Sequence, residues 1–175
     1  SLYEIPRSLN CSVSFLPLRF ENQFKPDLSE LDRLVTPQTR LVSLTHPNNP
    51  TGSMISSEAL AELIAWVEAR GLYLLFDETY REMGFENTLP PAATLSPRAI
   101  SLSSMSKCYG LPGIRIGWMV SQDQSLLKSV LNIREQVTIT NNAIGEEIAL
   151  QVLQQKDRYL SRARASILRN RAIVS

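Results

Sequence analysis

The sequence predicts an α/β fold of three layers (α/β/α), in which helices cover both faces of a mostly parallel sheet. Two observations carry this prediction. Short β-type segments alternate along the chain with longer segments whose apolar residues fall at helical spacing. One short segment, Leu72–Phe76, is apolar at every position, as expected of a parallel strand that is buried on both faces. Strands separated by helices in this way favour right-handed crossovers within one sheet.

The first half of the chain holds five predicted elements. They are a strand Ser12–Phe20, a helix from Asp27 to Val35, a strand Leu41–Thr45, a helix from Ser56 or Ser57 to Arg70, and the strand Leu72–Phe76. Pro17 places the first strand at an edge or a bend, because proline donates no ladder hydrogen bond. Asp27 and the serines are N-cap residues, and Gly71 ends the second helix.

The second half begins with an irregular, proline-rich segment, Asn87–Pro97, which we expect to be a surface loop. Two strands and three helices are predicted after it: Ala99–Ser103, Arg115–Val120, Leu126–Arg134, Ala143–Gln155, and Asp157 to the end. In the helix Ala143–Gln155, the apolar face is predicted to be formed by Ile144, Ile148 and Val152 together with Ala149 and Leu153.

Composition excludes several classes of protein. With 43% apolar and 20% charged residues in 175, the chain is globular rather than disordered. A formal net charge of +1 gives no reason to expect nucleic acid or an anionic membrane as a partner, and no apolar run is long enough to span a bilayer. Cys11 and Cys108 form neither a disulfide framework nor a zinc site, so a cytoplasmic location is expected. Because the chain starts without Met and ends within a helical pattern, we expect pieces at both ends to be missing.

Polar residues follow three of the predicted strands, and ligands of α/β sheets bind at the carboxyl ends of strands. They are the segments His46–Gly52, Asp77–Tyr80 and Ser104–Lys107. Each has an ordinary explanation by itself: a turn, an N-cap and a solvated lysine. Together they suit a cofactor with an aldehyde, a ring nitrogen and a phosphate, because a lysine forms an imine, a carboxylate holds a ring proton and an arginine binds phosphate.

Three motifs make the sequence similar to a known family. Ser104–Gly117 (SMSKCYGLPGIRIG) matches the lysine-site pattern of the fold-type I pyridoxal-phosphate aminotransferases of class I/II throughout, and HPNNPTG and FDETY match two further signatures in the right order. The resemblance covers essentially the whole chain. It implies pyridoxal 5'-phosphate as the cofactor and the large, cofactor-binding domain of that family as the fold.

The resemblance also implies roles for individual residues. Lys107 would carry the internal aldimine and then move a proton between the substrate Cα and the cofactor C4′. Asp77 would pair with the pyridinium nitrogen, and Tyr80 and Asn49 would hydrogen-bond the ring oxygen. The phosphate would be bound by Ser104 and Arg115, with Ser106 as a weaker candidate. No family role matches Cys108, and His46 is expected to have no chemical role.

By resemblance, residues 1–155 belong to the large domain and residues 156–175 begin the helix that leads to a small domain. Family members are longer and are usually homodimers. We therefore expect a glycine-containing phosphate loop and a stacking aromatic residue upstream, and an arginine for the substrate carboxylate downstream.

Three functions agree with these residues. The first is an aminotransferase that moves an amino group from an amino acid to a 2-oxo acid. The second is another reaction on the same scaffold, namely β-elimination, or replacement or cyclisation at the β- or γ-carbon. The third is a cofactor-sensing domain of a transcription regulator, whose DNA-binding part would lie upstream. The residues that separate the first two lie mostly outside this chain.

Overall fold

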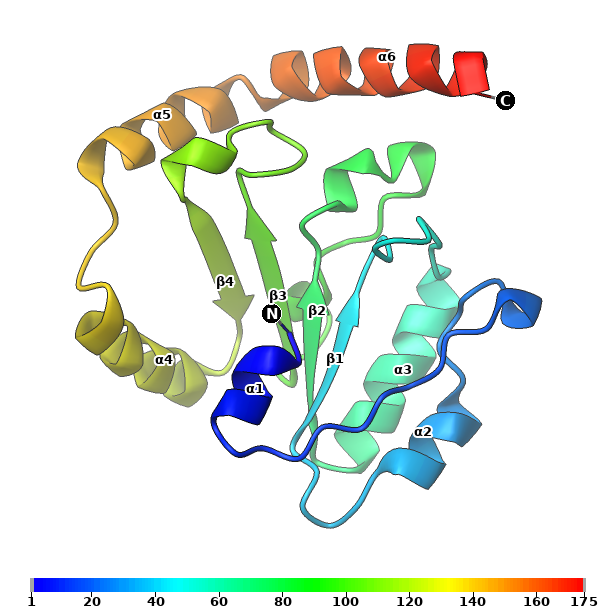
Figure 1. Cartoon of the computed structure of the whole chain (residues 1–175). Coiled ribbons are helices and arrows are strands. Elements are labelled where there is room, and N and C mark those ends of the chain that lie inside the picture. The colour runs from blue at the N-terminus through cyan, green and yellow to red at the C-terminus, as the bar shows by residue number, and fades with distance from the viewer. Residues whose placement is uncertain (1, 175) are drawn as a thin grey trace.

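A four-stranded sheet forms the centre of the computed structural model, which describes residues 2–174, with the backbone alone at Glu86. The strands lie in the order β1 Leu41–Thr45, β2 Tyr73–Asp77, β3 Ala99–Ser104 and β4 Gly117–Ser121. The first three are parallel and β4 is antiparallel to β3 (Figure 1). The predicted α/β fold with a mostly parallel sheet is therefore confirmed.

Six α-helices are described, and short 3-10 turns connect several elements. The helices are α1 Glu4–Ser8, α2 Leu28–Leu34, α3 Ser57–Ala69, α4 Gln124–Val137, α5 Ala143–Gln154 and α6 Lys156–Val174. Side chains placed just before them set four of these starts: Asp27 accepts from the Ser29 amide, Ser56 from the Ala59 amide, Asp123 from the Ser125 and Leu126 amides, and Asn142 from the Gly145 amide. These caps satisfy amides that have no partner within the helix.

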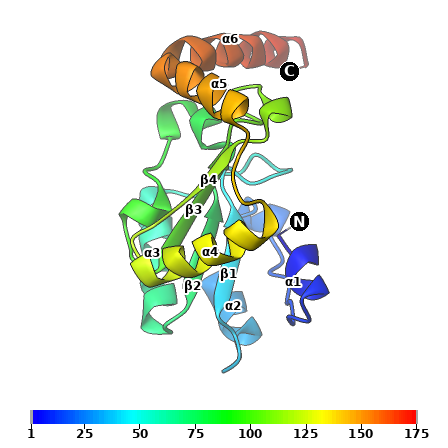
Figure 2. The ribbon, with the colours of Figure 1, turned by 90° about the vertical axis from the view of Figure 1, so that its left-hand side faces the viewer.

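The helices lie on different sides of the sheet. Helices α3 and α1 are on opposite faces, and α4 lies beside β4 (Figures 1 and 2). Helices α5 and α6 cross the edge at which β1, β2 and β3 end (top of Figure 1). Helices α5 and α6 therefore cover the end of the sheet at which ligands of such folds bind.

The main core is formed between the sheet and α3. Its buried members include, from the sheet, Val42, Leu74, Phe76 and Ala99, and from α3, Leu60, Leu63, Ile64 and Val67. Burying one such aliphatic side chain contributes about 1.5–3 kcal/mol. Burial along β2 alternates, with Leu74 and Phe76 buried and Tyr73 and Leu75 half-buried, so the expectation of complete burial on both faces is wrong for this strand.

The predicted strand Ser12–Phe20 is wrong. These residues run as an irregular segment until a 3-10 turn, Phe20–Asn22, and they pair with no strand in residues 2–174. Leu16 packs against the main core, whereas Phe15 and Phe20 are exposed. Apolar alternation here reflects the docking of single side chains, and Pro17 removes one of the amides that a ladder would need.

Two further expectations need correction. In the segment Asn87–Pro97, the side chains of Ala92, Ala93 and Ser96 are buried, and Ala92–Thr94 forms a 3-10 turn, so the segment is not merely a surface loop. In α5 the predicted face is right for Ala149 and Val152, which are buried, but Ile144 is 77% exposed, and Gly145 is buried instead. The bounds of β1 are as predicted, and the other boundaries differ from the predicted ones by at most three residues, which is ordinary at frayed ends.

Within the described part of the chain, no helix combines the length and the apolar character needed to cross a membrane. The same residues contain no cluster of three or more histidine, cysteine, aspartate or glutamate side chains placed to hold a metal ion.

Candidate active site at the carboxyl ends of the strands

Backbone hydrogen bonds join the segments that follow the strands. They run from the His46 amide to Asp77 O at 2.8 Å, from the Glu78 amide to Leu102 O at 2.8 Å, and from the Met105 amide to Ile116 O at 3.0 Å. The loops that carry Asn49, Asp77, Lys107 and Arg115 therefore start from one edge of the sheet, as the strand-end rule predicts.

Asp77 is the last residue of β2 and is half-buried. Its Oδ1 accepts the Thr79 amide at 3.0 Å and the Thr79 hydroxyl at 2.5 Å. The carboxylate thus closes a turn over its own backbone, as the ordinary explanation of Asp77 requires. This turn uses one carboxylate oxygen, and Oδ2 accepts no hydrogen bond from any described residue.

The segment after β3 presents a lysine between two anchored neighbours. The hydroxyls of Ser104 and Ser106 share a hydrogen bond of 2.6 Å, and the Ser106 amide donates to the Ser104 hydroxyl at 3.3 Å. Cys108 is buried, and its thiol donates to the Thr79 carbonyl at 3.1 Å. The side chain of Lys107 is exposed and makes no hydrogen bond or ion pair with residues 2–174, although the Lys107 carbonyl accepts the Gly110 amide at 3.0 Å. Its amine is therefore available to a ligand.

Asn49 and Tyr80 lie on two other loops of the same edge. Asn49 is exposed, and its backbone amide donates to the Thr45 hydroxyl at 3.4 Å, which fixes the loop to the end of β1. Tyr80 is half-buried and precedes the 3-10 turn Arg81–Met83. Neither side chain has a hydrogen bond within the described chain, so both are available to donate one to a ligand.

Arg115 has an unusual backbone for its residue type, with φ at 59° in the left-handed region. Such a conformation persists where neighbouring contacts enforce it, and it is common at functional sites. Here the carbonyls on both sides are bound: Ile114 O accepts the Asn142 side-chain amide at 3.0 Å, and Ile116 O accepts the Met105 amide. The guanidinium is exposed and donates to Pro112 O at 2.9 Å.

Two buried titratable groups lie next to this edge but face the core. His46 is stacked on Phe76, and burial lowers its pKa. Glu78 accepts the Ala92 amide at 2.7 Å and the Ser101 hydroxyl at 2.8 Å, and burial raises its pKa. Both side chains thus have structural partners on the core side of the sheet edge.

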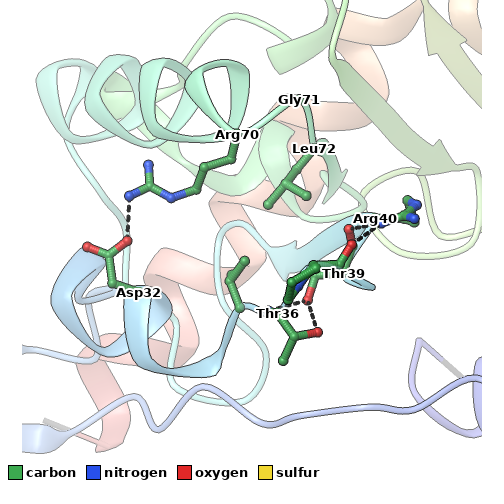
Figure 3. Close-up of a pocket in the computed structure, with 9 residues that line it drawn as sticks. Asp32, Thr36, Thr39, Arg40, Arg70, Gly71 and Leu72 are labelled. Carbon is green, nitrogen blue, oxygen red and sulfur yellow. Dashed lines mark hydrogen bonds and ion pairs between the residues drawn. The ribbon is translucent and has the colours of Figure 1, made fainter.

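A hollow of about 540 Å³ opens at the other end of the sheet, where β1 and β2 begin (Figure 3). Its charged side chains are already engaged: Arg70 pairs with Asp32 at 2.5 Å, and Arg40 donates to the carbonyls of Pro37 and Thr39. This hollow contains none of the residues of the strand-end edge, and the motifs of the sequence do not point to it.

The strand-end residues fit pyridoxal phosphate by the chemistry of their donors and acceptors. A free lysine amine, a carboxylate with one unoccupied oxygen, a tyrosine and an asparagine, and two serines with an arginine are the groups that its aldehyde, ring nitrogen, ring oxygen and phosphate require. Two contributors were absent from the sequence prediction: Thr79, which holds Asp77, and Asn142, which holds the turn before Arg115. The role of Thr79 could have been found in the sequence, because an aspartate two residues before a threonine is a common turn pattern.

Comparison with known proteins agrees with this assignment. Capreomycidine synthase of Streptomyces vinaceus is 32% identical over 160 residues, which cover 90% of this chain and 40% of that protein. LL-diaminopimelate aminotransferase 2 of Trichormus variabilis is 35% identical over 109 residues, covering 60% of this chain and 28% of that protein. A PLP-dependent aminotransferase from Streptococcus suis superposes with a TM-score of 0.91 at 32% identity, over 99% of this chain and 46% of that one.

The chain thus spans less than half of the length of these relatives. The family described as aminotransferase class I and II matches residues 1–174, which is nearly the whole sequence. The chain belongs to the class I and II aminotransferase family.

Proposed function

We propose that the protein is a pyridoxal-phosphate-dependent aminotransferase that moves an amino group from an amino acid to a 2-oxo acid. The observation that carries this proposal is the placement of a free lysine, Lys107, one residue from the thiol that contacts the loop of Asp77. The family membership and the names of several relatives support it.

When bound, the cofactor supplies an electron sink that accepts the charge left at the substrate Cα after its proton departs. Asp77 keeps the ring nitrogen protonated through the oxygen that the Thr79 turn leaves free. Asn49 and Tyr80 bind the ring oxygen, and Ser104, Ser106 and Arg115 bind the phosphate. Arginine suits this role because its planar fork matches phosphate oxygens.

Lys107 performs the proton transfer. Its amine would hold the cofactor through the aldehyde. As a free amine it would take the proton from the substrate Cα, and as an ammonium it would give that proton to C4′ of the cofactor. The exposure of Lys107 and the anchoring of Ser106 and Cys108 on either side suit a mobile amine on a fixed backbone.

A second reaction on the same scaffold has specific support. The relative that covers 90% of this chain is named a synthase, not a transaminase. Elimination, replacement or cyclisation at the β- or γ-carbon needs the same lysine and carboxylate, and it ends with the cofactor returned to its aldehyde form.

Further proposals concern surroundings. We propose a homodimer, amino acid and 2-oxo acid as the small-molecule partners, and the cytoplasm as the location. Exposed apolar side chains on α4, among them Ile133 and Val137, support association with another chain, and the two free cysteines suit a reducing compartment.

One experiment separates the two reactions. The protein expressed from its complete reading frame is loaded with pyridoxal phosphate and mixed with single amino acids, without any 2-oxo acid. A transaminase converts the cofactor to its amine form and releases an equal amount of 2-oxo acid. A lyase or cyclising enzyme leaves the cofactor as the aldehyde while the amino acid is consumed. The variant Lys107→Ala is the control, and conversion at the wild-type rate in that variant would contradict the proposal.

A further inference from the structure

Thr79 lies between the two residues on which the proposed function depends most. Its hydroxyl and its amide both donate to Asp77 Oδ1, at 2.5 and 3.0 Å, and its carbonyl accepts the thiol of Cys108 at 3.1 Å. One residue thus contacts the carboxylate at the end of β2 and the segment that carries Lys107. The three family motifs assign no role to this residue.

The turn at Asp77 differs from two similar turns elsewhere in the chain. Asp27 and Asp123 also accept the amide and the hydroxyl of a serine two residues later, and each of them starts an α-helix. No α-helix starts at the Asp77 turn, and the 3-10 turn after it begins only at Arg81. Helix capping therefore does not explain why the Asp77 side chain is held.

Holding one carboxylate oxygen determines what the other can do. Two donors on Oδ1 fix both side-chain torsions of Asp77, because a rotation about either bond breaks at least one hydrogen bond. Oδ2 remains without a partner within the described chain. A carboxylate fixed before a ligand arrives loses little conformational freedom on binding, which is the advantage of preorganised polar groups.

The contact with Cys108 extends this arrangement to the lysine segment. Cys108 is only 4% exposed and follows Lys107 directly, so its side chain anchors the backbone from which the lysine projects. Removing the thiol removes its hydrogen bond to the Thr79 carbonyl, whereas serine keeps a donor at that place.

We infer that Thr79 is a positioning residue for the cofactor ring: it holds Asp77 with Oδ2 free for the ring nitrogen and, through Cys108, sets the place of Lys107. This inference rests on the proposed function and deepens it. The residue type matters for the contact with Asp77, because the bond from Cys108 goes to the backbone carbonyl of residue 79. Valine preserves the branched shape of threonine without the donor, and serine preserves the donor without the branch.

The test uses the protein from its complete reading frame, loaded with pyridoxal phosphate that carries ¹⁵N in the ring. Wild type is compared with Thr79→Val, Thr79→Ser and Asp77→Asn. The ¹⁵N resonance reports protonation of the ring nitrogen, and single-turnover mixing with an amino acid reports the reaction. In Thr79→Val, we expect the resonance to shift toward that of Asp77→Asn and kcat to fall about tenfold, as for one lost hydrogen bond to a charged group, with little change in KM. Thr79→Ser should restore both.

The outcomes separate this inference from the proposed function. A wild-type resonance and rate in Thr79→Val would overturn the inference alone. Reductive trapping that places no cofactor on Lys107 of the wild type would overturn the proposed function. If Thr79→Val proves unfolded by its thermal transition, Cys108→Ala and Cys108→Ser test the other end of the link. Slower reductive trapping at Lys107 in Cys108→Ala, restored in Cys108→Ser, supports the inference, and equal rates in all three proteins overturn it.

Discussion

The imidazole of His46 lies nearly parallel to the ring of Phe76, with centroids 5.3 Å apart and planes inclined by 13°. The Nε2 atom of His46 accepts the Ile55 amide at 3.1 Å, so the neutral ring carries its proton on Nδ1. This hydrogen bond joins the two ends of the loop that carries Asn49, namely the end of β1 and the segment before α3. The geometry needs a neutral histidine, because a proton on Nε2 would face the donor of Ile55.

A pH-dependent stability follows from this arrangement. Burial lowers the pKa of His46 below the ordinary histidine value of 6.5. As pH falls below 6.5, the unfolded chain binds a proton that the folded chain excludes, so the free energy of unfolding decreases until the pH reaches the lowered pKa. We expect urea unfolding between about pH 7.5 and pH 5.5 to show this loss, up to about 1.4 kcal/mol per pH unit.

The control is His46→Gln, which keeps a neutral acceptor but cannot titrate. Glu78 changes the free energy of unfolding with the opposite sign, because burial raises its pKa. The folded chain holds a proton there that the unfolded chain releases above pH 4.5, so this contribution to stability decreases as pH rises. That contribution is present in both proteins, so the difference between their pH slopes isolates His46. Equal slopes would show that His46 does not titrate over this range.

Covalent attachment at Lys107 is the most direct prediction of the site. Borohydride reduction of the loaded protein, followed by peptide mapping, should place the pyridoxyl group on Lys107 and on none of the other lysines, Lys25, Lys128 and Lys156. Lys128→Ala is the matched control and should label as the wild type does. A label on any other lysine would remove Lys107 from its proposed role.

Asp77→Asn should act on the reaction rather than on cofactor binding. Asparagine can keep the turn with Thr79 but lacks the charge that holds the ring nitrogen protonated. We expect cofactor to bind and transamination to fall by two orders of magnitude or more, since about 1.4 kcal/mol in the barrier corresponds to each factor of ten.

The control for this substitution is Asp27→Asn. Asp27 accepts the amide and the hydroxyl of Ser29 at 2.8 and 2.7 Å, which is the same local arrangement, but it caps α2 away from the strand-end edge. Turnover should be unchanged there. If Asp77→Asn also retained turnover near the wild-type rate, Asp77 would be a turn residue only.

The elements that could be predicted from the sequence are those specified by neighbouring residues. Asp27 and Ser56 cap α2 and α3 by accepting backbone amides two and three residues later in the sequence. Both helix starts therefore depend on neighbouring residues alone. The convergence of Asp77 and Lys107 follows equally from a general rule, because parallel strands end at one edge.

The rest depends on contacts between distant segments. Ser12–Phe20 has the alternation of a strand, but whether a partner strand accepts it is decided elsewhere in the chain. The antiparallel direction of β4 also has no signature in its periodicity. Asn142 caps α5 by accepting the Gly145 amide, which is a local contact, but its side-chain NH2 also donates to Ile114 O across 28 positions of sequence. Such pairings become visible only in three dimensions.

The last prediction concerns the approach of α5 to the turn before Arg115. A Cβ atom on Gly145 would lie 2.8 Å from Ile114 O and 2.7 Å from both terminal atoms of Asn142. Gly145→Ala should therefore push α5 away from the turn and release the left-handed backbone of Arg115. We expect the free energy of unfolding to fall by about 1–3 kcal/mol, as is typical of overpacking. Gly113→Ala is the matched control, because a Cβ there meets nothing within 4 Å although it lies two residues from Arg115. If Arg115 binds the phosphate, Gly145→Ala should lower the affinity for pyridoxal phosphate about tenfold, equivalent to about 1.4 kcal/mol. The affinity for pyridoxal, which has no phosphate, should stay nearly unchanged. Titration of the four combinations by absorbance gives the answer: equal losses for both ligands would show that α5 supports the fold of the site as a whole and not the phosphate arginine.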